Sequence, residues 1–169
     1  MKGRIHVYTG DGKGKTSAAL GVLIRAKGWG MRCFLIQFMK GMETGEVKVL
    51  EALGIPVKRF GFPYFPDIRN LKEEEKEVLL AGWEEAKRRM REEIDVLVLD
   101  EFSYLFLSGT VNQKEAVEEI KKRWEGMELV LTGREMPPEI VEIADLVTEM
   151  RCVRHYFEKG EPPRKGVEF

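Results

Sequence analysis

The sequence is poor in cysteine and histidine, with 2 of each among 169 residues. Cys33 lies in a short apolar run, Cys152 lies near the end of the chain, and neither has the spacing of a metal site. We therefore expect buried free thiols in a reducing compartment. His6 and His155 stand beside no candidate nucleophile, which favours a reaction in which the ligand or a cofactor is the nucleophile and the protein positions it.

The chain also lacks a strong net charge and a long apolar segment. Its 28 basic and 29 acidic residues give a net charge of -1, so no overall field would attract nucleic acid or an anionic membrane. No signal peptide opens the sequence, and no apolar run approaches the roughly 20 residues that span a bilayer. We expect a cytoplasmic protein with neither partner, folded as a single domain over residues 1–169.

Five short apolar runs alternate with segments of helical periodicity. The runs cover residues 5–8, 33–37, 57–60, 96–99 and 129–132. This alternation is typical of an α/β domain. Because the run 96–99 is apolar on both faces, it favours the interior of a mostly parallel sheet with helices on both faces.

Amphipathic helices are expected over residues 71–93 and 114–124, the second ending at a cap formed by Gly126. The first contains the basic run 87–91, which we interpret as a solvated helix face paired with glutamates one turn earlier rather than as a nucleic-acid patch. The tail, residues 150–169, is predicted to form a final hairpin or edge extension.

A glycine-rich segment joins the first predicted strand to a predicted helix and matches a phosphate-binding loop. The segment consists of Thr9, Gly10, Asp11, Gly12, Lys13, Gly14, Lys15, Thr16 and Ser17. Successive backbone N–H groups there can face one anion, Lys15 can reach the outer phosphates, and the Thr16 hydroxyl can ligate Mg²⁺. We favour Lys13 as an extra phosphate ligand over a solvated lysine, and a functional loop over a plain glycine-rich turn.

The loop departs from the pattern G-x-x-x-x-G-K-[ST] at its first position. Thr9 stands where the first glycine is expected, and Gly10 comes one place late. A shifted glycine changes the path of the backbone, so the bound triphosphate need not adopt the pose that it has in an ordinary ATPase.

Two further groups follow predicted strands at the same edge of the sheet. Asp100 and Glu101 close the run 96–99, where a carboxylate can hold Mg²⁺ directly or through water. Arg134 follows the run 129–132, and two interpretations stay open for it: a contact to phosphate or ribose, or a helix cap.

The loop 61–67 contains two prolines and three aromatic residues, among them Phe62 and Tyr64. Apolar rings in a loop need to be covered. Either the loop folds back on the protein's own core, or it lines a pocket for a flat apolar ligand, and the residues alone favour neither.

With these motifs assembled, the sequence resembles the ATP:corrinoid adenosyltransferases of the cobalamin pathway. The similarity covers almost the whole chain and rests on residues 7–19, 37–41, 98–101, 131–134 and 166–169. The most specific of these segments is the phosphate loop with its late glycine.

This resemblance implies a RecA-like P-loop fold and a displacement at carbon in adenosylcobalamin biosynthesis or salvage. A Co(I) corrinoid attacks the ribose C5′ of ATP and expels triphosphate, with ATP reversed along the loop relative to an ATPase. Carried over to this chain, residues 10–16 bind the triphosphate. Lys15, Thr16 and Glu101 form the catalytic set, and Thr16, Glu101 and Asp100 organise Mg²⁺.

The resemblance also assigns Phe62 and Tyr64 to the corrinoid, held against the ring so that the lower cobalt ligand is displaced. Tyr64 stands where the family pattern leads us to expect Trp. Met1 precedes the first predicted strand by only a few residues, whereas some relatives carry a helix there that covers the corrinoid. A homodimer and a flavoprotein reductant are further expectations, while the natural corrinoid cannot be read from residue types.

Two other classes of function remain to be weighed. A small-molecule kinase or ATPase would use the same loop to act at the γ-phosphate and would yield ADP. A nucleotide-dependent binding module would contact DNA or a protein partner, and the near-neutral charge argues against DNA. A GTPase is disfavoured because no N-K-x-D motif is present.

Overall fold

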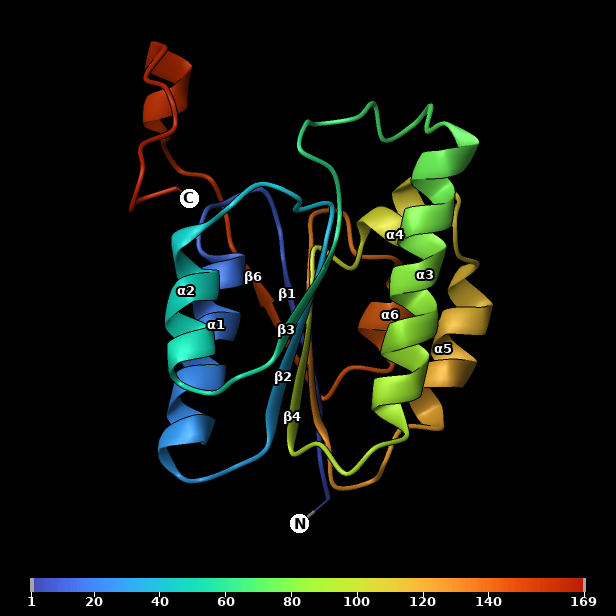
Figure 1. Ribbon diagram of the computed structural model, residues 1–169. Helices are drawn as coiled ribbons and strands as arrows, with labels where there is room; N and C mark the ends of the chain where they lie inside the picture. The colour runs from blue at the N-terminus through green and yellow to red at the C-terminus, as the bar shows by residue number, and fades with distance from the viewer. Residues whose placement is uncertain (1, 169) are drawn as a thin grey trace.

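Six parallel strands form the centre of the molecule, in the order β3-β2-β4-β5-β1-β6 (Figure 1). The computed structural model describes residues 2–168, so Met1 and Phe169, the last residue of the segment 166–169, lie outside it. The strands are β1 (Ile5–Thr9), β2 (Cys33–Phe38), β3 (Val57–Phe60), β4 (Val96–Asp100), β5 (Glu128–Thr132) and β6 (Leu146–Glu149).

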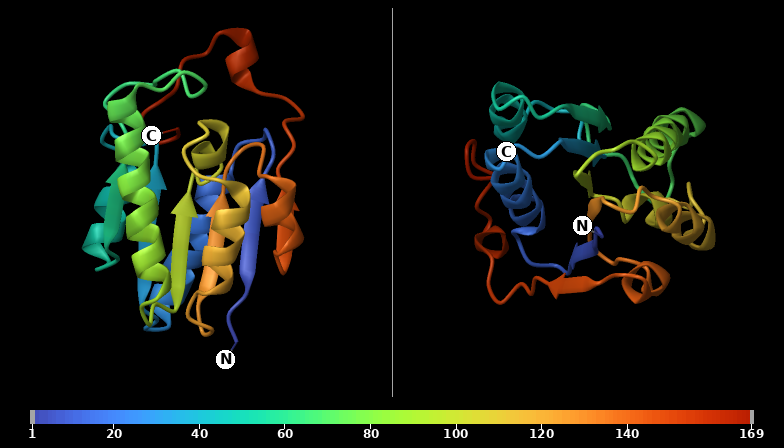
Figure 2. Two further views of the ribbon diagram at one scale, coloured as in Figure 1. Left: turned by 90° about the vertical axis from the view of Figure 1, so that its right-hand side faces the viewer. Right: turned by 90° about the horizontal axis from the view of Figure 1, so that it is seen from below.

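Helices cover both faces of this sheet (Figures 1 and 2). One face carries α1 (Lys15–Gly28) and α2 (Gly45–Ala52), and the opposite face carries α3 (Glu73–Met90), α5 (Gln113–Lys121) and α6 (Pro138–Glu142). The short α4 (Tyr104–Leu107) follows β4, and a 3₁₀ helix, η1 (Tyr156–Lys159), lies in the tail. The predicted α/β, RecA-like P-loop fold is confirmed, with β5 inserted between the phosphate-loop strand β1 and the acidic strand β4.

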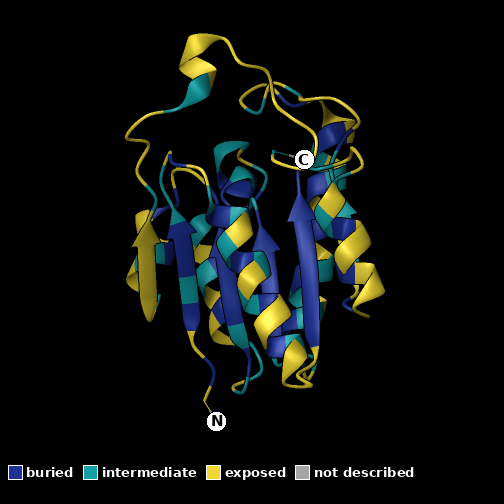
Figure 3. Cartoon of the chain, turned by 90° about the vertical axis from the view of Figure 1, so that its left-hand side faces the viewer, coloured by how far each residue is buried: buried dark blue, intermediate teal, exposed yellow. Residues whose placement is uncertain are grey.

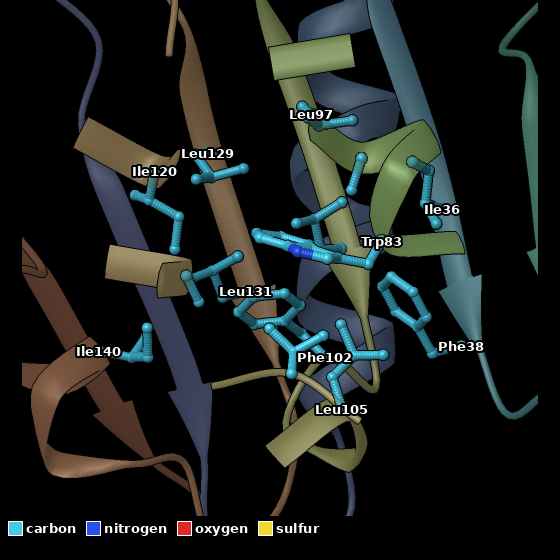
Figure 4. Packing of buried hydrophobic residues seen from close by; sticks show 14 of the residues in the cluster. Ile36, Phe38, Trp83, Leu97, Phe102, Leu105, Ile120, Leu129, Leu131 and Ile140 are labelled. Atoms are coloured by element: carbon cyan, nitrogen blue, oxygen red, sulfur yellow. The ribbon is translucent and has the colours of Figure 1, made fainter. Parts of the chain in front are cut away.

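The larger core lies under α3, where Trp83 is only 1% exposed. Its ring packs 5.8 Å from that of Phe102, which in turn lies 6.2 Å from the ring of Phe38 (Figure 4). Gly82 lets the helix approach the sheet, because a Cβ atom there would lie 2.8 Å from the rings of Phe38 and Phe60. A second core under α1 completes the burial of the central strands (Figure 3).

The predicted helices form with shifted ends. Glu85 accepts hydrogen bonds from Arg88 and Arg89 within α3, as the solvated-face interpretation expects. The prediction that Gly126 caps α5 is wrong, because that helix ends at Lys121 and Lys122 is its C-cap. Gly126 instead lies against the ring of Trp124, where a Cβ atom would collide with the indole.

Two sequence predictions fail toward the end of the chain. The exposed edge strand β6 was not expected, because it is short and shows no apolar alternation. The predicted hairpin or edge extension over 150–169 is wrong: residues 150–168 contain no strand and form η1 and turns, and Pro162 and Pro163 remove two backbone donors that a strand pair needs.

The two cysteines differ in their environments. Cys33 is buried as predicted, and burial raises the pKa of its thiol to about 11. Cys152 is exposed, so the prediction of two buried thiols is wrong for this residue, because the segment after β6 leaves the sheet. Over residues 2–168, no helix is both long and apolar enough to cross a membrane.

Candidate nucleotide site

A cleft of about 550 Å³ opens at the carboxyl edge of the sheet, where the phosphate loop leaves β1. The predicted site residues that line it are Asp11, Gly12, Lys13, Gly14, Lys15, Thr16, Ser17, Glu101 and Arg134. Thr9, Gly10 and Asp100 are not among the lining residues, and Asp100 is fully buried. The fold therefore brings the motifs after β1, β4 and β5 together at one edge, as expected for parallel strands.

The late glycine of the loop has a structural reason. Gly10 has a φ of 94°, and a Cβ atom there would overlap the carbonyl oxygen of Met150 at the end of β6. Gly12 donates its N–H to the same oxygen at 2.6 Å. The loop thus packs against the end of β6, and a side chain at position 10 would push it away.

Lys15 lies folded into its own loop. Its ammonium donates to the carbonyl oxygens of Gly10 at 2.6 Å and Gly12 at 2.8 Å, and the side chain is buried. Burial lowers the pKa of Lys15, and the neighbouring Glu101 carboxylate offsets part of this effect. An entering phosphate would replace two neutral carbonyls with charged oxygen atoms, so the lysine is positioned to exchange them.

Asp100 is the centre of a buried polar network. Its Oδ1 accepts hydrogen bonds from Thr16 at 2.9 Å and Thr132 at 2.6 Å, and its Oδ2 accepts from Lys40 at 2.7 Å and Gln37 at 3.1 Å. Burial raises the pKa of Asp100, but the Lys40 charge and these hydrogen bonds outweigh it and hold the pKa below its ordinary value. Asp100 is therefore ionised.

Three members of this network were not assigned from the sequence: Lys40, Gln37 and Thr132. They stand at the ends of β2 and β5, so only the strand order brings them to Asp100. The available signal was their occurrence at the ends of apolar runs, which in a parallel sheet meet at one edge.

Glu101 provides a carboxylate suited to a cation. Its φ of 58° is unusual for a residue with a side chain, and Thr132 Oγ1 accepts its N–H at 3.0 Å. The Glu101 Oε2 atom is buried and has no hydrogen-bond partner among residues 2–168. Burial and the adjacent Asp100 raise the pKa of Glu101 above its ordinary value. A cation at Oε2 would give this atom a partner and would favour the ionised form of the carboxyl group.

The donor set fits Mg²⁺ only if the ligand supplies part of the coordination. Thr16, Asp100 and Glu101 offer oxygen atoms, yet no group of three or more His, Cys, Asp or Glu side chains within the described part of the chain can hold a metal. Mg²⁺ in nucleotide sites commonly keeps one or two protein carboxylates and takes its other ligands from phosphates and water.

Arg134 and Lys13 both line the cleft but differ in their contacts. Arg134 is exposed and forms no hydrogen bond or ion pair within residues 2–168, and α6 begins without a side-chain cap, so the helix-cap interpretation has no support. The Lys13 ammonium donates to Tyr156 Oη at 2.9 Å, to the Val167 carbonyl at 3.1 Å and to Glu168 Oε1 at 2.7 Å. In this structure Lys13 therefore binds the tail.

The two aromatic residues predicted for the corrinoid lie outside the cleft. Phe62 is 8% exposed and packs into the larger core, whereas Tyr64 is 49% exposed and stacks on Phe62 with ring centroids 5.6 Å apart. Tyr64 Oη donates to Glu75 at 2.8 Å. Phe65 is 84% exposed. One ring of the loop therefore covers the core, as the first interpretation expects, whereas the other two rings are exposed and line no described pocket, so the ligand-pocket interpretation stays a prediction.

The aromatic loop crosses the segment that carries Lys40. Phe60 accepts a hydrogen bond from the Met39 N–H at 2.8 Å, a Cβ atom at Gly41 would overlap the Phe62 backbone, and one at Gly61 would overlap the backbone around Lys40. Only glycines permit this double contact. Residues 39–41 and 60–62 are thereby locked together beside the cleft.

A family model described as ATP:corrinoid adenosyltransferase BtuR/CobO/CobP matches residues 1–169. The chain belongs to this family. Curated relatives named corrinoid adenosyltransferase include those of Escherichia coli K12, which is 33% identical over 99% of this chain and 86% of its own, and of a Sinorhizobium species, 36% identical over 99% and 81%. Corrinoid adenosyltransferase CobA of Salmonella typhimurium is 32% identical over 99% of this chain and 86% of its own.

The resemblance deduced from the motifs of this adenosyltransferase is thus confirmed along the whole chain. Among solved structures, domain III of the Thermotoga maritima replication initiation protein DnaA aligns with 96% of this chain and 56% of its own, with a TM-score of 0.43 and 17% identity.

Proposed function

We propose that this protein transfers the 5′-deoxyadenosyl group of ATP to the Co(I) centre of a corrinoid and releases triphosphate. The observation that carries this proposal is the match of the adenosyltransferase family to the full chain, including the phosphate loop with its late glycine. The cobalt centre belongs to the substrate, so the protein needs no nucleophile of its own, in keeping with its lack of a histidine-based catalytic pair.

The residues of the cleft would act on the triphosphate as a leaving group. Backbone N–H groups of residues 10–16 and the Lys15 ammonium bind phosphate oxygens, and their charge stabilises the negative charge that triphosphate gains when the C5′–O bond breaks. Arg134, exposed in the same cleft, adds a second cation for phosphate or ribose. Lys13 can join them when the tail releases it.

Mg²⁺ is part of this proposal. Thr16, Glu101 and Asp100 would hold it, and the partnerless Glu101 Oε2 is the atom that most needs such a cation. When bound, Mg²⁺ neutralises the charge that develops on the leaving triphosphate. Thr16 orients its hydroxyl toward the site through its hydrogen bond to Asp100.

The corrinoid would lie against the aromatic loop. Tyr64, stacked on the buried Phe62, presents a supported ring face, and Phe65 adds exposed apolar surface beside it. A flat macrocycle can bury such rings from water, which stabilises binding in proportion to the apolar area covered. The core contact of Phe62 keeps the loop in place.

Products distinguish this reaction from γ-phosphate chemistry. Incubation of the protein with ATP, Mg²⁺ and chemically reduced cobalamin should yield adenosylated corrinoid and inorganic triphosphate in equal amounts, detected by absorbance and by chromatography. The Lys15→Ala variant serves as the control for contaminating activity. ADP as the only nucleotide product would exclude adenosyl transfer and support the kinase or ATPase alternative.

Three further assignments belong to the same proposal. We infer that the enzyme acts as a cytoplasmic homodimer and receives electrons for cobalt from a flavoprotein. Sedimentation analysis tests the homodimer, with a monomer at micromolar concentration contradicting it. Turnover with a flavoprotein reductase in place of chemical reductant tests the second, and comparison of cobalamin, cobinamide and cobyrinic acid diamide identifies the preferred corrinoid.

A further inference from the structure

Lys40 occupies the place where a cation is needed beside the phosphate loop. Its ammonium lies 2.7 Å from Asp100 Oδ2, 3.3 Å from Thr16 Oγ1 and 3.8 Å from Glu46 Oε1. Thr16 and Asp100 are two of the residues that we assign to Mg²⁺. The lysine also lines the cleft, so its charge lies between the buried carboxylate and the space open to the nucleotide.

Asp100 has no free position for a metal in this arrangement. Each carboxylate oxygen has about two lone-pair positions, and both oxygens of Asp100 already accept two hydrogen bonds. A divalent cation can bind Asp100 directly only if one donor leaves. An ammonium that stayed within a few Å of that cation would also repel it.

Of the four donors, Lys40 is the one that can leave. Gln37 and Thr132 are fully buried on β2 and β5, and Thr16 begins the first turn of α1. The Lys40 side chain is 25% exposed, and its flexible four-carbon stem can move the ammonium toward the cleft without a change in the backbone.

The backbone around Lys40 has little freedom to move. Met39 has a φ of 62°, and Gly41 crosses the Phe62 backbone too closely to allow a Cβ atom. The backbone of residues 39–41 therefore cannot shift freely, so a response to a ligand there has to come from the side chain of Lys40. In the nucleotide-free protein Lys15 does not occupy this position, because its ammonium donates to the carbonyls of its own loop.

We propose that Lys40 is an exchangeable cation of the nucleotide site. It neutralises Asp100 in the nucleotide-free protein, and it gives up this carboxylate to a divalent metal when a triphosphate arrives whose oxygens can accept the ammonium. Metal binding is thereby made conditional on nucleotide. The inference rests on the proposed triphosphate site and not on adenosyl transfer.

The first part of the proposal is that Lys40 keeps a metal from Asp100 in the nucleotide-free protein. Binding of Mn²⁺ alone to that protein tests it, with free Mn²⁺ followed by electron paramagnetic resonance. Because removal of the ammonium leaves Asp100 uncompensated, Lys40→Met should bind Mn²⁺ at least about 10-fold more tightly than the wild type. Lys48→Met is the matched control and should leave Mn²⁺ affinity unchanged, since within residues 2–168 Lys48 pairs only with the exposed Glu43. Equal affinity in the wild type and Lys40→Met would overturn the proposal.

Lys40→Gln is a second variant that tests the same point if Lys40→Met fails to fold. It retains a hydrogen-bond donor for Asp100 while removing the charge, and circular dichroism checks that it is folded. It should also bind Mn²⁺ more tightly than the wild type because the charge is gone, with a smaller gain than Lys40→Met because its amide can still donate to Asp100. The wild type gives a check that needs no variant: saturable Mn²⁺ binding at micromolar concentration without nucleotide would contradict the exchange.

Binding of inorganic triphosphate tests the second part of the proposal, that the Lys40 ammonium moves from Asp100 to the triphosphate oxygens. In the presence of Mg²⁺, calorimetry should show that Lys40→Gln binds triphosphate about 10-fold more weakly, because one charge-assisted contact is lost. Unchanged triphosphate affinity would show that Lys40 does not transfer to the ligand and would overturn the exchange. Neither measurement contains a corrinoid, so an ADP product in the turnover assay would refute adenosyl transfer and leave these results standing.

Discussion

The two halves of the carboxyl edge differ in how completely they are assembled. Around Asp100 every lone pair is used and the side chains come from β2, β4, β5 and α1. In the loop 61–67 the rings of Tyr64 and Phe65 face outward. The nucleotide half is therefore preorganised, whereas the aromatic half presents apolar surface that a ligand would bury.

The halves are nevertheless connected by backbone. Residues 39–41 carry Lys40 toward Asp100 and pass directly against residues 60–62. Figures 1 and 2 show that the segment following β3 and the tail both lie beyond the carboxyl ends of the strands. A shift of residues 39–41 would displace residues 60–62, and the reverse also holds, because neither backbone has room to move alone.

The largest effect is expected where the nucleotide half meets the leaving group. Lys15→Ala should lower adenosyl transfer by about 10³-fold, since one preorganised charge on the transition state is lost. The melting temperature should change little, because the Lys15 ammonium donates to just two carbonyls in the described part of the chain. Lys48→Ala is the control for the loss of a lysine. Wild-type turnover by Lys15→Ala would remove this residue from the site.

Asp100→Asn probes the stability of the same half. The Asn amide would face the donors Lys40 and Gln37, so the free energy of unfolding should fall by about 3 to 4 kcal/mol at neutral pH. The folded-state pKa of Asp100 lies below its ordinary value of 3.8. Its stabilisation is therefore fully present above that value and is lost as pH falls through the lower folded pKa.

Urea unfolding of the wild type and Asp100→Asn between pH 3 and pH 7 measures this difference. The gap between the two proteins should be constant from about pH 5 upward and should narrow in acid. A gap that stays the same at pH 3 would show that the charge of Asp100 does not stabilise the fold.

The aromatic half can be tested with a matched pair of phenylalanines. Phe62→Ala should lower the free energy of unfolding by about 3 kcal/mol, because it leaves a cavity in the core. Phe65→Ala should change it by less than about 0.5 kcal/mol, because that ring is exposed, while weakening corrinoid binding. Chemical denaturation and corrinoid titration separate the two effects. Unaltered corrinoid affinity in Phe65→Ala would exclude this ring from the binding surface.

The smallest effect is expected for the hydroxyl of Tyr64. Tyr64→Phe removes the hydrogen bond to Glu75 and should cost about 1 kcal/mol of stability or less. Corrinoid affinity should be retained, because the stacked ring remains. A large loss of affinity, measured by the same titration, would mean that the phenol oxygen rather than the ring face contacts the ligand.

Much of the fold could be predicted because β2, β4 and β5 consist of apolar runs that are buried on both faces. β1 to β5 were expected within a residue of their observed ends, and α3 and α5 within a few residues. β6 was missed because an exposed four-residue edge strand has little pattern to detect. The tail was misjudged because its prolines and Gly160 were taken for a hairpin turn, whereas they end η1 and prevent pairing.

The residue types of the phosphate loop, Glu101 and Arg134 were sufficient to predict which residues line one cleft at the carboxyl edge, because local spacing dictates how a loop presents its N–H groups. Assembly of the sheet was needed for the rest. It brings Lys40, Gln37 and Thr132 to one carboxylate, directs Lys13 to the tail, and buries Phe62 while exposing Tyr64. Such contacts depend on strand order and helix packing, which join residues far apart in the chain and leave no mark on local sequence.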